Sequence, residues 1–124
     1  MIVDFRELGI SEDLTGLLKK NGITVPTPVQ EQSIQYIRSG RDLIAQAQTG
    51  TGKTLAFLLP LFEDIDISKD QIQVLIMTPT RELAIQITNE AEKLREYKDI
   101  NILAAYGGRD IAGSYTHLTL PTIL

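Results

Sequence analysis

The sequence of 124 residues has no cysteine and no surplus of basic residues. Without cysteine the chain forms neither disulfides nor cysteine-ligated metal sites, which agrees with the reducing cytoplasm, where we expect the protein. Its formal net charge of −4 argues against a non-specific nucleic-acid binder coated in lysine. A few well-placed donors in one groove would still allow contact with a nucleic-acid backbone.

Long hydrophobic runs are also missing. The longest apolar stretch, residues 56–62, is interrupted by Pro60 and is too short to span a membrane. The first eight residues include charged side chains and lack the apolar core of a signal peptide. With 43% hydrophobic and 23% charged residues, the composition is that of an ordinary soluble globular protein. We therefore expect one small domain, or part of a larger one, with no membrane partner.

What the sequence does contain is an alternation of helix and strand patterns. Apolar residues recur at helical spacing in four segments, and three short apolar runs between them indicate buried strands. The predicted helices cover 11–20, 27–38, 53–62 and 81–96, and the predicted strands cover 42–46, 71–77 and 100–106. Strands that alternate with helices in this way predict an α/β fold with a parallel sheet flanked by helices.

A glycine-rich loop between a predicted strand and a predicted helix is the most informative segment. It consists of Ala47, Gln48, Thr49, Gly50, Thr51, Gly52, Lys53 and Thr54. Gly50 and Gly52 permit backbone angles that let successive N–H groups point inward, where they bind phosphate oxygens together with the positive helix end. Lys53 would reach the terminal phosphates, and the Thr54 hydroxyl would ligate Mg²⁺. A plain glycine turn that only caps a helix is the alternative.

The strict form of this phosphate loop begins with glycine, where the chain has Ala47. Alanine is typical of the DEAD-box RNA helicases, whose loop has the form A-x-T-G-x-G-K-T. The chain resembles that family without a mismatch from Ala47 to Thr54. The resemblance implies a P-loop NTPase fold of the RecA-like type, here the N-terminal lobe. It also implies ATP and Mg²⁺ as cofactors, RNA as the partner, and Lys53 and Thr54 as catalytic residues.

A second segment, within residues 3–31, resembles the adenine-reading motif of the same family. The resemblance implies that Gln30 reads the adenine edge and that Phe5 packs on the adenine ring. A carboxamide offers one donor and one acceptor, the pair that adenine requires and guanine does not match. The alternative gives Gln30 a capping-box role and Phe5 a core position, and both interpretations can hold together. Ile23 stands where the family usually has Phe or Tyr, so a stacking ring is lost.

Two further segments resemble the family's contacts with RNA. The first consists of Pro79, Thr80, Arg81 and Glu82 at the start of a predicted helix, and the second is the doublet Gly107 and Gly108 after a predicted strand. A hydroxyl, a guanidinium and a helix N-terminus can hold a single-stranded backbone without reading its bases, and glycines permit close approach. The alternatives are a helix start with Thr80 as cap and Arg81 in solvent, and an ordinary glycine turn.

The resemblance runs from residue 5 to about residue 113. Residues 1–113 therefore predict an incomplete helicase ATP-binding domain, and residues 114–124 an atypical tail of suspected foreign origin. The family continues with an Asp-Glu-Ala-Asp box and a second RecA-like lobe, which would be the partner in cis. We predict the ATP-binding lobe of an ATP-dependent RNA helicase. The alternatives are a non-catalytic ATP- and RNA-binding module, and another P-loop motor such as a DNA helicase.

The isolated chain should show neither ATPase activity nor unwinding, because phosphoryl transfer needs a carboxylate near Mg²⁺ and a positioned water that the sequence does not recognisably supply. We also expect unpaired sheet edges, with poor solubility or partial order. Release of phosphate from ATP, measured on the purified chain and on Lys53→Ala, checks the first expectation. Turnover that Lys53→Ala abolishes would contradict it, and a sharp, cooperative melt would contradict the second.

Overall fold

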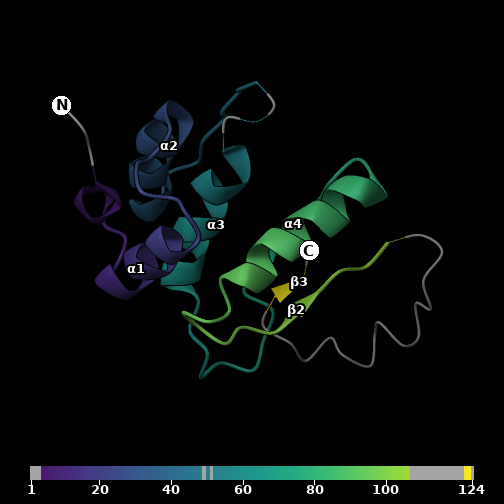
Figure 1. Cartoon of the computed structure of the whole chain (residues 1–124). Helices are drawn as coiled ribbons and strands as arrows, with labels where there is room; N and C mark the ends of the chain where they lie inside the picture. Colours follow the sequence, from purple (N-terminus) through teal and green to yellow (C-terminus); the bar gives the residue numbers. More distant parts are fainter. Residues whose placement is uncertain (1–3, 49, 51, 107–121, 124) are drawn as a thin grey trace. The chain divides into compact units, whose positions relative to one another are not determined.

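The computed structural model describes residues 4–48, 50, 52–106 and 122–123 of the chain (Figure 1). The chain folds as two compact units, Met1–Asp64 and Ile65–Leu124, each of which is described here by itself. The first unit is helical, and the second combines a helix with a small sheet. Within the described residues, no helix is both long and apolar enough to cross a membrane.

The first unit consists of a short 3-10 helix and three α-helices. In chain order these are η1 (Phe5–Leu8), α1 (Glu12–Lys20), α2 (Pro28–Arg38) and α3 (Lys53–Asp64). The three predicted α-helices of this unit are confirmed, and α3 is two residues longer than its apolar pattern indicated. The helix α2 packs along α3 and also touches η1 (Figure 1). The helices of this unit bury a core that includes Phe5, Leu14, Leu18, Ile34 and Leu59.

The helix ends of this unit follow from local hydrogen bonds. The Ser11 hydroxyl accepts from the Leu14 N–H at 3.3 Å and caps α1. At the other end Gly22 adopts a φ of +81°, and the Ile23 N–H donates back to the Leu18 carbonyl at 2.8 Å. This left-handed glycine closes α1 in a Schellman motif.

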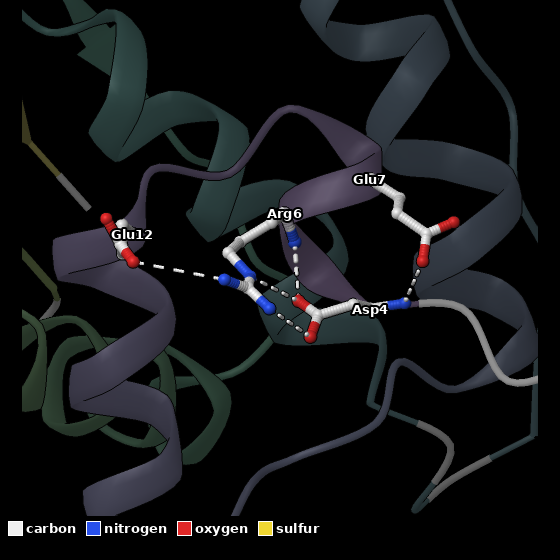
Figure 2. Close-up of polar contacts among 4 residues, drawn as sticks. All are labelled: Asp4, Arg6, Glu7 and Glu12. Atoms are coloured by element: carbon white, nitrogen blue, oxygen red, sulfur yellow. Dashed lines mark hydrogen bonds and ion pairs between the residues drawn. The ribbon is translucent and has the colours of Figure 1, made fainter.

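The turn η1 is held by a cluster of charged side chains (Figure 2). The Asp4 carboxylate accepts from the Arg6 N–H at 2.9 Å, while the Glu7 carboxylate accepts from the Asp4 N–H at 3.3 Å. The Arg6 guanidinium pairs with Asp4 at 3.3 Å and lies 3.9 Å from the Glu12 carboxylate. These contacts fix the turn that places Phe5 in the core.

The same contacts hold the pKa of Asp4 below its usual value, first through the Arg6 N–H and then through the guanidinium. The unfolded chain therefore binds a proton at Asp4 more readily than the folded chain does. This contribution to stability is complete above a pH of about 4. It is lost as the pH falls through the lower pKa of the folded state.

The described residues of the second unit form three short parallel strands and one helix. Its elements are β1 (Val74–Leu75), α4 (Arg81–Lys93), β2 (Ile102–Leu103) and β3 (Thr122–Ile123). The strand order is β1-β3-β2, with Thr122 in register with both Val74 and Ile102. The helix α4 packs against β2 and ends three residues before the predicted limit of 96. The strand β3 lies in the tail, where the sequence predicted no element.

The predicted strands are only partly confirmed. The segments 71–77 and 100–106 contain strands of two residues each, and the prediction of a strand at 42–46 is wrong, because residues 41–48 form neither helix nor strand. A strand is defined by hydrogen bonds to a neighbour, and an apolar pattern alone does not provide that neighbour. As a result Ile44 is 99% exposed and Met77 86% exposed. Apolar side chains in these described segments are thus left exposed.

The capping box of α2 can be tested directly. Thr27→Ala should speed hydrogen exchange of the first-turn amides of α2 by about fivefold, because loss of an N-cap costs about 1 kcal/mol. Thr27→Ser keeps the hydroxyl that accepts from the Gln30 N–H at 3.4 Å, and it should exchange like the parent. Exchange measured by NMR decides the matter, and equal rates in the Ala and Ser variants would contradict a capping role.

Candidate nucleotide and RNA site

The phosphate loop adopts the backbone that its glycines predicted. Gly50 has a φ of +84° and Gly52 a φ of +86°, both in the left-handed region that favours glycine. The helix α3 begins directly afterwards at Lys53, and the Gly52 carbonyl accepts from the Ala56 N–H at 3.2 Å. The loop therefore ends at the N-terminus of a helix of 12 residues. Two loop members, Thr49 and Thr51, lie outside the described residues.

The electrostatics of this helix start suit an anion. The first turn of α3 has no acidic residue, whereas α1, α2 and α4 each carry at least one there. Lys53 is exposed at the first helical position, and Thr54 beside it is half-buried. Ala47 is half-buried and Gln48 exposed at the other side of the loop. Free N–H groups, the helix dipole and a lysine together form an environment that stabilises phosphate.

Gln30 joins the predicted adenine-reading motif to this loop. Its side chain is only 2% exposed, and both ends of its carboxamide are hydrogen-bonded. The oxygen accepts from the Thr27 N–H at 2.9 Å, which confirms the capping box, and Nε2 donates to the Gly52 carbonyl at 3.2 Å. The structure thus brings together two motifs that are 22 residues apart in the sequence.

Gly52 is required for space as well as for backbone angle. A Cβ built on Gly52 would collide with Nε2 of Gln30 and would lie 3.2 Å from the Thr27 hydroxyl. A Cβ on Gly50 would meet nothing within 4 Å. The two glycines therefore differ, because Gly50 serves conformation alone and Gly52 also admits the buried carboxamide.

Phe5 occupies the core position that was the alternative to a nucleotide contact. Its side chain is 0% exposed, so its ring is closed to a ligand in this conformation. Ile23, where the family usually has an aromatic residue, is half-buried just after α1. Gln30 is nearly as buried as Phe5, but its carboxamide lies against the phosphate loop through the Gly52 carbonyl.

The predicted RNA contacts lie in the second unit, at the N-terminus of α4. The Thr80 hydroxyl accepts from the Leu83 N–H at 3.2 Å and caps the helix, as its alternative role predicted. Pro79, Arg81 and Glu82 are exposed around this cap. The doublet Gly107 and Gly108 lies outside the described residues. The start of α4 therefore presents polar and cationic groups at one helix end.

Tyr106 was missed by the sequence analysis. The Arg81 guanidinium carbon lies 5.4 Å from the centroid of the Tyr106 ring. The aromatic residue was assigned only to a strand, whereas β2 ends three residues earlier, at Leu103. Topology could have indicated that Tyr106 lies near Arg81, since segments that follow parallel strands of one sheet emerge at the same sheet edge.

These features define the class of the protein: a P-loop nucleotide-binding α/β protein of the RecA-like type. The sequence profile of the DEAD/DEAH box helicases matches residues 27–124. The chain belongs to the DEAD/DEAH box helicase family. The matched residues include the phosphate loop and the helix start at Thr80.

Relatives and solved structures agree with this assignment. The chain is 48% identical over 107 residues to the ATP-dependent RNA helicase CshA of Limosilactobacillus reuteri, covering 86% of this chain and 22% of the relative. It is 47% identical to the DEAD-box ATP-dependent RNA helicase CshA of Bacillus anthracis over 86% of this chain and 20% of the relative. The chain thus spans about a fifth of the length of these curated relatives.

Two crystal structures share the fold. A DEAD box protein from the hyperthermophile Methanococcus jannaschii superimposes with a TM-score of 0.89 at 36% identity, over 97% of this chain and 33% of that one. The RNA helicase Prp28 from Chaetomium thermophilum, bound to ADP, gives a TM-score of 0.83 at 34% identity, over 97% of this chain and 31% of that one. The α/β lobe predicted from the sequence is therefore confirmed.

Three glycine substitutions distinguish the steric requirement at Gly52 from the backbone requirement at Gly50. Gly50→Ala should lower stability by about 1–2 kcal/mol, because a residue with a Cβ is strained in the left-handed backbone conformation. Gly52→Ala should lower it further, because its methyl group also collides with Gln30. Gly16→Ala, inside α1 with nothing within 4 Å, should raise stability by about 0.5–1 kcal/mol. Thermal unfolding followed by circular dichroism ranks the stabilities of the three variants. If Gly52→Ala is no less stable than Gly50→Ala, the close packing of Gly52 against Gln30 is contradicted.

Proposed function

We propose that the chain is the ATP-binding N-terminal lobe of an ATP-dependent RNA helicase, binding ATP with Mg²⁺ and the backbone of single-stranded RNA. The observation that carries the proposal is the 3.2 Å hydrogen bond between the Gln30 carboxamide and the Gly52 carbonyl. It places a group that can read a base beside a loop that can hold phosphates. A generic phosphate loop needs no such neighbour.

The residues of the phosphate loop fit a nucleoside triphosphate. N–H groups at Gly50 and Gly52 and the start of α3 would hold the phosphate oxygens, and Lys53 would neutralise the terminal phosphates. The half-buried Thr54 hydroxyl would be a ligand of Mg²⁺ together with those oxygens. When bound, the metal supplies charge stabilisation to the phosphates. The role proposed for these residues is to bind and position the triphosphate.

Adenine recognition by Gln30 would replace existing hydrogen bonds. The carboxamide oxygen already accepts from Thr27 and the nitrogen already donates to Gly52. Adenine offers one acceptor and one donor, so each bond with the protein can be exchanged for one with the base. Guanine presents the wrong pair, so Gln30 would keep its bonds to Thr27 and Gly52 and gain none with the base. Preference for ATP over GTP follows.

RNA contact is assigned to Pro79, Thr80, Arg81 and Glu82 at the start of α4, with Gly107 and Gly108 as further members. A helix N-terminus and a guanidinium bind phosphate without reading bases, which suits an enzyme acting on many sequences. We infer unwinding and ATP hydrolysis for the whole protein, where a second RecA-like lobe is the partner in cis. The absence of cysteine from the sequence favours a cytoplasmic location.

Displacement of a fluorescent ATP analogue tests the nucleotide site. ATP should displace the probe at lower concentrations than GTP. Lys53→Ala should weaken binding about tenfold or more, because a hydrogen bond to a charged group contributes about 1.5–3 kcal/mol. Lys69→Ala, which removes an exposed lysine from a loop, should bind like the parent. Unchanged binding by Lys53→Ala would contradict the phosphate site.

The same assay tests adenine reading on its own. Gln30→Ala should lose the preference for ATP over GTP, whereas Gln32→Ala, an exposed neighbour on α2, should keep it. If the parent chain binds both nucleotides equally, the phosphate site can stand but the adenine assignment fails.

A further inference from the structure

We propose that Tyr106 is a positioning residue for RNA binding, whose ring holds the Arg81 guanidinium where it can meet a backbone phosphate. The inference rests on the proposed RNA contact of Arg81 and adds a residue to it. It starts from the distance of 5.4 Å between the Arg81 guanidinium carbon and the Tyr106 ring centroid. At this separation the ring quadrupole attracts the cation.

Topology explains why these two side chains meet. The strands β1 and β2 both run parallel to β3, so their carboxyl ends lie at the same edge of the sheet. Arg81 follows β1 at the first position of α4, and Tyr106 follows β2 by three residues. Ligands of parallel α/β sheets bind at this edge, outside the carboxyl ends of the strands.

The surroundings of the pair form a place for a chain of phosphates. Arg81 and Tyr106 both line a cavity of about 500 Å³ together with Thr78, Pro79 and Thr80. The Thr78 hydroxyl donates to the Thr80 carbonyl at 2.9 Å, which ties down the turn that precedes α4. The cavity thus joins a fixed helix N-terminus, a guanidinium and an aromatic wall.

An aromatic ring suits this task better than a carboxylate would. A carboxylate that held Arg81 would occupy its N–H donors and repel phosphate. A ring holds the cation through its π face and takes up none of the five donors itself. The ring therefore restricts a long, flexible side chain without competing with the ligand. Tyr106 is half-buried, which gives the platform a fixed position.

The chain offers a matched control for this pair. Arg41 lies 5.9 Å from the Tyr36 ring centroid, a similar cation–π pair within the other unit. Tyr36→Ala removes a ring of the same kind without touching the proposed RNA contact. If Tyr106→Ala and Tyr36→Ala change RNA binding to the same extent, the change results from loss of a tyrosine in general.

The test is binding of a fluorescein-labelled oligouridine to the full chain by anisotropy over a range of salt concentrations. Tyr106→Ala should weaken binding about two- to fivefold, the size of an exposed cation–π contact. It should also reduce the salt slope by up to about 0.7, the share of one phosphate on a single strand. Arg81→Ala should do the same, and the double variant should lose no more than Arg81→Ala alone. Tyr36→Ala should bind like the parent.

Two substitutions distinguish positioning from packing. Tyr106→Phe keeps the ring and should bind RNA with the affinity and salt slope of the parent. Tyr106→Leu keeps an apolar side chain without the ring and should bind like Tyr106→Ala. Equal rescue by Phe and Leu would overturn the proposal, as would a normal salt slope in Tyr106→Ala when Arg81→Ala has lost one. If Arg81→Ala binds like the parent, or the parent binds no RNA, the proposed RNA contact itself fails and the role of Tyr106 falls with it.

Discussion

The proposed nucleotide site depends on one buried carboxamide, that of Gln30. By accepting from the Thr27 N–H and donating to the Gly52 carbonyl, it ties the start of α2 to the start of α3. An amide buried to this degree must stay hydrogen-bonded at both ends, because leaving one end unsatisfied costs about 1–3 kcal/mol. The phosphate loop is therefore held by a neighbouring helix as well as by its own glycines. This explains why Gly52 has no room for a side chain.

The sheet is governed by a different constraint, the need of every strand for a neighbour. The three strands in the described residues are two residues long, and Leu75 in β1 and Met77 after it remain exposed. Even so, the parallel arrangement brings the segments after β1 and β2 to one edge. That edge places Arg81 beside Tyr106, so sheet topology positions the proposed RNA contact even where the strands are short.

Helices and strands differ in how far the sequence could predict them. The predicted helices 11–20 and 27–38 are confirmed with their caps at Ser11 and Thr27, because caps depend on residues only three positions away. The strand at 42–46 was predicted wrongly, because its formation depends on hydrogen bonds to a distant segment. Motifs identified Gln30, but the sequence could not give its bond to the phosphate loop. Tyr106 escaped notice because it was assigned to the predicted strand 100–106, whereas β2 ends at Leu103.

The central claim is that Gln30 and the phosphate loop form one adenine-selective nucleotide site. NMR of the Gln30 side-chain amide, recorded while ATP and Mg²⁺ are added, tests it most directly. The account predicts that ATP shifts this amide together with the N–H signals of Gly50 and Gly52, whereas GTP at the same concentration leaves the side-chain amide unshifted. A loop that responds to ATP while the Gln30 amide stays where it was would contradict the account.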